Sequence, residues 1–186
     1  IRDFTPLTCV ATSPSMLVAH PSVAAKDVRE LIALAKAKPG KLNFAIGAVG
    51  SSLHLAGDLF KMQSGAFIVN IPYRGTAPAI QDVIAGQVEL MFAAVGTAQA
   101  HIKAGKLKAL GVTSSKRLAA FPDVPAIAEV LPGYESSAWF GLFGPARMNA
   151  ELTKRISDAA RQAIATPEVR KRLEAEGSVA VGNSPD

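Results

Sequence analysis

The chain has 186 residues, of which 49% are hydrophobic and 19% charged, a composition that excludes a disordered protein and suffices for a full hydrophobic core. No apolar run reaches membrane-spanning length, so we expect no direct membrane insertion. The net charge of +5 favours anionic ligands, but dispersed lysines and arginines and the lack of an RNA-binding aromatic signature disfavour nucleic acid. The single cysteine, Cys9, excludes an internal disulfide and a thiol-metal site.

The first predicted element consists of apolar residues 7–10 and 16–19 on either side of Pro14, which suit two strands or one strand bent at the proline. Helices and strands then alternate at short spacing. They are a helix starting at or just after Ser22 and stopped by Pro39-Gly40, strand 42–46, a helix from 51 or 52 to about 62, strand 66–71, a helix after Thr76 that closes at Gly86, strand 88–92, a helix around 98–102, and strand 107–112. This alternation is typical of a parallel sheet built from βαβ units.

After Arg117 the pattern changes to a proline-rich connection with one short helix near 127–130. A glycine-interrupted strand at 138–145, helices at 149–165 and 167–176, and a last strand at 179–181 follow. The α/β block of about 23–115 is therefore flanked by strands that we expect to belong together elsewhere. Neither end resembles a natural chain end, so we expect the sequence to be a piece of a longer protein.

The candidate site centres on the turn after strand 42–46, where Gly47 and Gly50 break the strand and Ser51 or Ser52 stands at the N-cap position. Free N–H groups and the helix dipole suit a small anion there, although an ordinary strand–helix turn is the alternative. The P-loop lysine is missing and the dinucleotide fingerprint is not matched. Phosphate is therefore not implied over carboxylate.

Two further turns rich in small polar residues, Arg74-Gly75-Thr76 and Gly96-Thr97, are expected at the same sheet edge, because carboxyl ends of parallel strands meet there. Arg74 suits a bidentate contact with a carboxylate, or faces solvent as an ordinary turn residue. Tyr73 offers a phenol or an apolar wall.

Nucleophilic catalysis finds little support. No G-x-S-x-G elbow is present, and Ser51 and Ser52 are read first as caps. His54 lines the pocket or is structural, and neither His20 nor His101 has a metal partner four residues on. We expect no catalytic residue, metal or cofactor; a small hydrolase or transferase that uses His54 or Ser51 is the alternative.

An ordered series of motifs extends over essentially the whole chain. The series comprises 41–59, Ile71-Pro72-Tyr73-Arg74-Gly75-Thr76-Ala77-Pro78-Ala79, Gly86-Gln87-Val88-Glu89-Leu90-Met91-Phe92, 101–110, 121–125 and 137–141. Each motif alone is weak, but the ordered series is highly specific. It resembles the tripartite tricarboxylate transporter receptors, the Bug-type periplasmic solute-binding proteins.

The resemblance implies a periplasmic-binding-protein-like α/β fold, with a parallel-sheet second lobe covered by helices on both faces and joined to a first α/β lobe by crossing strands. The expected boundaries are 1–20 for strands of a partial first lobe and the hinge crossing, 21–117 for the second lobe, 118–137 for a connection and 138–186 for the return to the first lobe. The family's glycine-rich loop of the first lobe has no counterpart, so the chain looks like a fragment with a complete second lobe.

In this family, backbone and hydroxyl groups of one turn from each lobe hold the ligand carboxylate, partly through water. The ligand-binding residues that the resemblance implies are Gly47, Gly50, Ser51, Ser52, His54, Tyr73, Gly75, Thr76 and Ala77. We add Arg74 and Ala93, which stand at the neighbouring turns. Relatives often carry a polar or acidic residue after the Met-Phe pair, whereas this chain has Ala93-Ala94-Val95. That departure disfavours amino-acid ligands and favours simple carboxylates or a ligand with an apolar tail.

The function implied is that of a periplasmic receptor that captures a small organic carboxylate between two lobes. It would deliver the ligand to the membrane components of a tripartite transporter and perform no chemistry. A sensor that reports ligand occupancy to a signalling partner is a further alternative.

Overall fold

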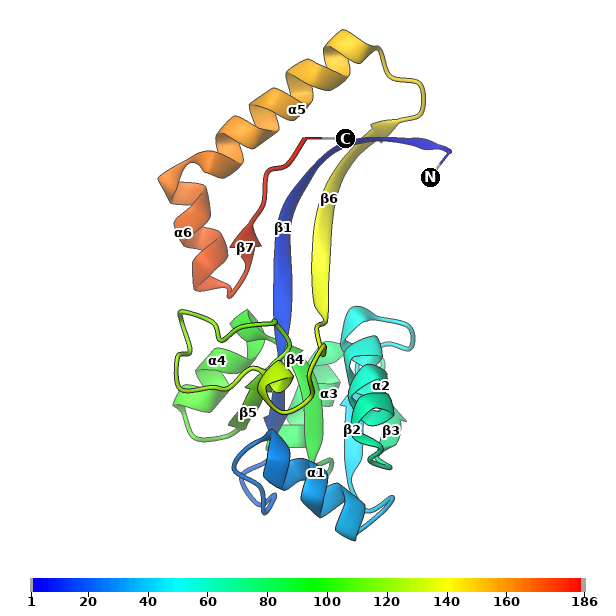
Figure 1. Ribbon diagram of the computed structural model, residues 1–186, viewed down its shortest axis with the longest axis vertical. Helices are drawn as coiled ribbons and strands as arrows, with labels where there is room; N and C mark the ends of the chain where they lie inside the picture. The colour runs from blue at the N-terminus through cyan, green and yellow to red at the C-terminus, as the bar shows by residue number, and fades with distance from the viewer. Residues whose placement is uncertain (1, 185–186) are drawn as a thin grey trace. The chain divides into compact units, whose positions relative to one another are not determined.

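The computed structural model describes residues 2–184, and the chain forms two compact units. Unit 1 comprises Ile1–Ser13 and Ala138–Asp186, and unit 2 comprises Pro14–Ser137. Strand β1 (Phe4–Ala19) contributes to both units and contains Pro14 (Figure 1). Of the two readings of this region, the single strand is confirmed.

The sheet of unit 2 has the strand order β3-β2-β4-β1-β5. Its strands, besides the end of β1, are β2 (Asn43–Ile46), β3 (Val69–Pro72), β4 (Leu90–Ala94) and β5 (Lys108–Val112). Strand β2 is parallel to both β3 and β4, as predicted, but β1 lies antiparallel between β4 and β5. The sheet is therefore mixed, because β1 has no βαβ connection to either neighbour.

Helices cover both faces of this sheet, which confirms the prediction (Figure 1). On one face, α1 (Val28–Ala37) and α2 (Ser52–Ser64) pack on strand residues that include Phe44 and Phe92. On the other face, α3 (Thr76–Ile84) and α4 (Val95–Lys103) pack on Ala45, Met91 and Ala93. Alternate residues of each strand thus supply two separate cores.

The start of α1 was predicted at Ser22 or in the segment just after it, and the structure places it in that segment and not at Ser22. The helix begins at Val28, and the side chain of its N-cap Asp27 accepts a hydrogen bond from Glu30 N at 2.9 Å. The Ser22 hydroxyl instead lies 2.7 Å from His20 Nδ1, in the loop after β1. Both residue types cap helices well, so their identity alone does not decide between them.

The proline-rich connection is part of unit 2 and packs on its core through η1 (Ile127–Glu129) and Tyr134. Tyr134 is fully buried, lies edge-on to Phe60 and donates its hydroxyl proton to Ala56 O of α2 at 2.9 Å. Burial raises the pKa of this phenol. This segment therefore fixes α2, the helix that begins at the candidate site.

Unit 1 contains the first part of β1, β6 (Ser137–Pro145), α5 (Ala150–Ala165), α6 (Pro167–Ala175) and β7 (Val179–Ala180). Both β6 and β7 pair with β1, and the buried Ser157 hydroxyl of α5 donates to Leu7 O at 2.8 Å. Asn149, predicted as the first residue of its helix, is instead the N-cap of α5. Pro167 opens α6, as the sequence predicts, after an N-cap, Thr166, that makes no side-chain capping bond among the described residues.

Candidate functional site

Three helix N-termini gather at the carboxyl edge of the unit 2 sheet. Strand β2 lies between β3 and β4 and is parallel to both, so the turns that lead into α2, α3 and α4 share one edge. This is the edge at which open α/β sheets bind ligands. The structure thereby brings together the three turns that the sequence singles out.

The first two turns contact each other through their backbones. Gly75 N donates to Gly47 O at 2.8 Å, and Tyr73 N donates to Ile46 O at 2.8 Å. A Cβ on Gly47 would stand 2.9 Å from Thr76 N and 3.0 Å from Gly75 C. Only glycine at position 47 allows the N-terminus of α3 to lie so close to the end of β2.

The first turn is held in shape by the side chain of Ser51, the N-cap of α2. Its hydroxyl accepts from His54 N at 3.3 Å and donates to Ala48 O at 2.8 Å. Gly50 has φ +80° within this turn, a conformation that favours glycine. Ser52 is exposed, and its hydroxyl makes no hydrogen bond with another residue of the described range 2–184. Ser51 is therefore the cap, and the Ser52 hydroxyl faces the solvent side.

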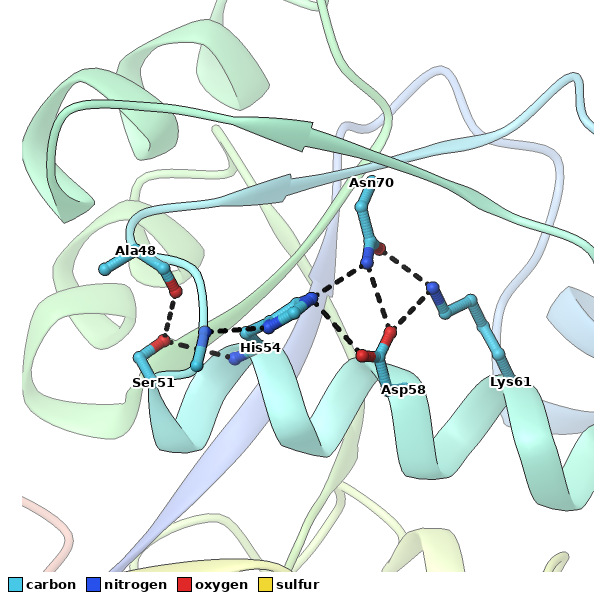
Figure 2. Close-up of polar contacts among 7 residues, drawn as sticks. Ala48, Ser51, His54, Asp58, Lys61 and Asn70 are labelled. Atoms are coloured by element: carbon cyan, nitrogen blue, oxygen red, sulfur yellow. Dashed lines mark hydrogen bonds and ion pairs between the residues drawn. The ribbon is translucent and has the colours of Figure 1, made fainter.

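A polar network beside this turn joins α2 to β3 (Figure 2). His54 Nδ1 accepts from Gly50 N at 3.0 Å, and Nε2 lies 3.3 Å from Asp58 Oδ2. Asn70 of β3 donates to Asp58 Oδ1 at 3.1 Å and accepts from Lys61 Nζ at 3.1 Å. The hydrogen bond from Lys61, at 2.7 Å, is the main cause that lowers the pKa of Asp58.

Of the side chains in this network, sequence reasoning singled out only that of His54. The signal for Asp58 and Lys61 is their spacing of four and seven residues from His54, which places all three on one helix face. Asn70 lies in a strand, where no local pattern indicates its partners. His54 therefore helps to hold the turn between β2 and α2 in place, through Gly50 N, and is not an isolated pocket residue.

In the second turn, between β3 and α3, the side chain of Tyr73 is hydrogen-bonded within the described chain, whereas that of Arg74 is not. The Tyr73 hydroxyl donates to Asp82 Oδ2 of α3 at 2.7 Å, and partial burial together with this bond raises the pKa of Tyr73 to about 12. Arg74 is exposed, and its guanidinium contacts no acidic group in the part of the chain that the structure describes. Arg74 is thus an unpaired cation at this edge.

The N-termini of α3 and α4 differ from that of α2. Their N-caps, Gly75 and Ala94, make no side-chain capping bond among the described residues. The first N–H groups of a helix have no acceptor within it, so those of Thr76 and Ala77 are available to a ligand. Ala93 is fully buried in β4 and paired with Met16, so its methyl group belongs to the core.

The described residues do not assemble a reactive centre at this edge. The contact between His54 and Ser51 runs through His54 N, and the Ser51 hydroxyl proton is donated to Ala48 O. In residues 2–184, no three His, Cys, Asp or Glu side chains gather closely enough to hold a metal ion. Nor does any described helix have the length and apolarity to cross a membrane. The geometry suits capture of an anion by backbone donors.

Comparison with known proteins decides the family. Residues 1–184 match the family model described as the tripartite tricarboxylate transporter family receptor. The chain belongs to this family. It is 33% identical over 187 aligned residues to protein BugT of Bordetella pertussis, an alignment that covers 100% of this chain and 57% of that protein. The predicted Bug-type resemblance is confirmed.

Two solved structures share the fold. Rpa4515 of Rhodopseudomonas palustris, solved with adipate, is 31% identical with a TM-score of 0.89, over 98% of this chain and 62% of that one. MatC (Rpa3494) of Rhodopseudomonas palustris, solved with malate, is 30% identical with a TM-score of 0.82, over 95% and 60%. The chain thus spans less than two thirds of each relative. These likenesses confirm the predicted fold class, and the matched family consists of receptors rather than enzymes.

Proposed function

We propose that the carboxyl edge of unit 2 binds a carboxylate group of a small organic acid. The observation that carries this proposal is the gathering of three helix N-termini at one sheet edge, two of them without a side-chain cap among the described residues. Each helix terminus adds partial positive charge, and the exposed Arg74 adds a full one.

The donors that we assign to the carboxylate are backbone N–H groups. Ser51 caps the third N–H of α2, which leaves those of Ser52 and Leu53 without an intrahelical acceptor. The N–H groups of Thr76 and Ala77 lie at the neighbouring turn, whose backbone is bonded to the first. Such preorganised donors bind an anion without first having to be ordered.

The ligand class follows from the groups at this edge. Where β4 runs into α4, the side chains of Ala93, Ala94 and Val95 supply no acceptor for an ammonium group, and the exposed Thr97 supplies a hydroxyl but no negative charge. Simple carboxylates, or carboxylates with an apolar tail, fit better than amino acids. The adipate and malate held by the two structural relatives belong to this class.

We further propose that the protein works in the periplasm as the receptor of a tripartite tricarboxylate-type transporter and delivers its ligand to the membrane components. The family match supports this role. The protein would release the ligand unchanged, because the backbone N–H groups that we assign to the carboxylate donate hydrogen bonds but take part in no reaction.

A thermal-shift panel of mono-, di- and tricarboxylates, amino acids, nucleotides and sugars tests the proposal, with the chain in its full natural length. A ligand at 100 times its Kd adds about 2.7 kcal/mol of stability, enough to raise the Tm by a few degrees. We expect shifts with one or a few carboxylates and recovery of the unchanged acid afterwards. Shifts with nucleotides or sugars alone, or turnover of the bound acid, would contradict it.

A further inference from the structure

Asn70 reaches the candidate site from outside the helix that follows the first turn. It lies in β3, where it is paired with Phe44 of β2. Phe44 and Ile68, which stands two residues before Asn70, both belong to the core beneath α1 and α2, so the side chain of Asn70 lies on the same face of the sheet. Figure 2 shows its amide directed towards α2.

The orientation of this amide is determined by two of its neighbours. The ammonium group of Lys61 can only donate, so the atom that faces it at 3.1 Å is Asn70 Oδ1. Asn70 Nδ2 then donates to Asp58 Oδ1 at 3.1 Å. The side chain of Asn70 is therefore held independently of the imidazole of His54, which lies beside it with Nε2 3.0 Å from Asn70 Nδ2.

The imidazole of His54 links Asn70 to the first turn. Its Nδ1 faces Gly50 N at 3.0 Å, and its Nε2 faces the amide of Asn70, so the ring lies between β3 and the turn (Figure 2). The side chain of His54 is 14% exposed. The ring has this place whichever of its nitrogens carries the proton.

Asp58 also lies against the ring, with Oδ2 3.3 Å from His54 Nε2, but it does not place the ring relative to the sheet. His54 and Asp58 are both residues of α2, so a contact between them moves with the helix. Asn70 belongs to β3, which is paired with β2, and β2 is the strand that ends at the first turn. The contact with Asn70 therefore relates the ring to the sheet edge from which the turn starts.

We propose that Asn70 is a positioning residue for the carboxylate site: it sets the place of the His54 ring, and the ring holds Gly50 N and with it the turn between β2 and α2. The inference rests on the proposed function for its effect on affinity, whereas its structural part stands on these contacts alone. The alternative is that Asn70 only ties β3 to α2, through Asp58 and Lys61 and without the ring.

A double-mutant cycle of Asn70→Ala and His54→Ala separates the two roles. Hydrogen exchange of the Gly50 amide, measured by NMR without ligand on the protein of full natural length, reports on the turn itself. We expect each single variant to accelerate this exchange about five-fold, the effect of one hydrogen bond, and the double variant to add nothing. Asn70→Ser, whose side chain is one bond shorter, should behave as Asn70→Ala does. Additive effects, or wild-type exchange at Gly50 in both Asn70 variants, would overturn the proposal.

The effect on affinity is measured by calorimetric titration of the same variants with adipate and with malate. Because Asn70 acts through His54, we expect the Kd to rise about five-fold in each single variant and no further in the double variant. A role confined to Asp58 and Lys61 would lower the Tm of Asn70→Ala and leave its affinity unchanged, which would overturn the proposal.

Asn43→Ala is the matched control, because Asn43 lies at the start of β2, the end opposite the site. Its Nδ2 donates to Glu89 Oε2 at 2.9 Å, so the substitution removes an asparagine hydrogen bond of similar length. We expect a lower Tm, with wild-type affinity and wild-type exchange at Gly50. Equal losses of affinity in Asn43→Ala and Asn70→Ala would overturn the proposal. If neither acid binds the wild-type protein, that result counts against the proposed function, and exchange at Gly50 still decides whether Asn70 positions the ring.

Discussion

The turns at the ends of β2 and β3 lie at one sheet edge but are held in different ways. The turn before α2 is fastened by side chains of its own helix, Ser51 and His54. The turn before α3 has no side-chain cap among the described residues and is held by the backbone bond from Gly75 N to Gly47 O. The first turn therefore acts as the scaffold, and the second turn depends on it.

The largest effect is expected from Gly47→Ala, because position 47 serves both turns. The added Cβ meets backbone atoms of Gly75 and Thr76, which cannot move aside as a flexible side chain would. We expect the free energy of unfolding to fall by about 1–3 kcal/mol and carboxylate binding to be lost. Urea unfolding and calorimetric titration measure the two losses.

Gly57→Ala is the matched control for that variant. Gly57 lies in α2, and its new Cβ would be 3.6 Å from Phe92 Cδ2, an ordinary contact. We expect unchanged or slightly increased stability, because alanine favours a helix by about 1 kcal/mol over glycine. A Gly47→Ala protein as stable and as competent in binding as Gly57→Ala would show that the turns do not depend on each other.

Arg74→Gln tests whether a residue of the second turn contributes to carboxylate affinity without contributing to the stability of the fold. The free guanidinium stabilises nothing in the described chain, so stability should be unchanged, while carboxylate affinity should fall by about 1.5–3 kcal/mol. Calorimetric titration at two salt concentrations measures the loss. Arg155→Gln, an exposed change on α5 of unit 1, removes the same charge and should leave affinity unaltered. Equal losses in both variants would make Arg74 a contributor of net charge only.

Ser51→Ala and Ser52→Ala distinguish the cap from its neighbour. Loss of the cap should lower the free energy of unfolding by about 1 kcal/mol, whereas Ser52→Ala should stay within about 0.5 kcal/mol. If the Ser52 hydroxyl contacts the ligand, as predicted, its removal lowers affinity alone. Thermal unfolding with and without adipate measures both effects. A Ser51→Ala protein of wild-type stability would contradict the fastening of the first turn.

The smallest effect is expected from Tyr73→Phe, which removes the side-chain bond of the second turn to Asp82. The folded-state pKa of Tyr73, about 12, lies above its unfolded value of about 10. The stabilisation it brings is therefore complete below about pH 10 and is lost as the pH rises towards 12. Tyr73→Phe should lose less stability over that interval than the wild type. Parallel curves of Tm against pH would contradict this.

Local signals explain why most elements of unit 2 were predicted from the sequence. Pro39-Gly40, Gly65, Gly86 and Gly105 end helices, and apolar runs mark the strands between them. The antiparallel place of β1 was missed because its partners lie far along the chain and leave no local pattern: Met91 is 73 residues from Val18, and Val112 is 96 residues from Met16.

The sequence predicted those parts of the candidate site whose interactions lie between residues close together in the chain. The rules of turns and caps pointed to Gly50 and to Ser51 or Ser52; the structure shows a positive φ at Gly50 and assigns the capping bond to Ser51. The Asp58–Asn70 bond was missed because charged helix residues are mostly solvated and the strand partner is set by the fold. Which residues contact the ligand stays a prediction.

An NMR titration of the ¹⁵N-labelled chain with adipate tests the central claim most directly, because each backbone amide reports on its own contact. We predict that the largest shifts occur at the amides of Ser52, Leu53, Thr76 and Ala77, and that Arg74→Gln weakens the titration without moving its location. Shifts confined to unit 1, or binding that leaves these four amides unperturbed, would contradict the assignment of the carboxylate to this edge.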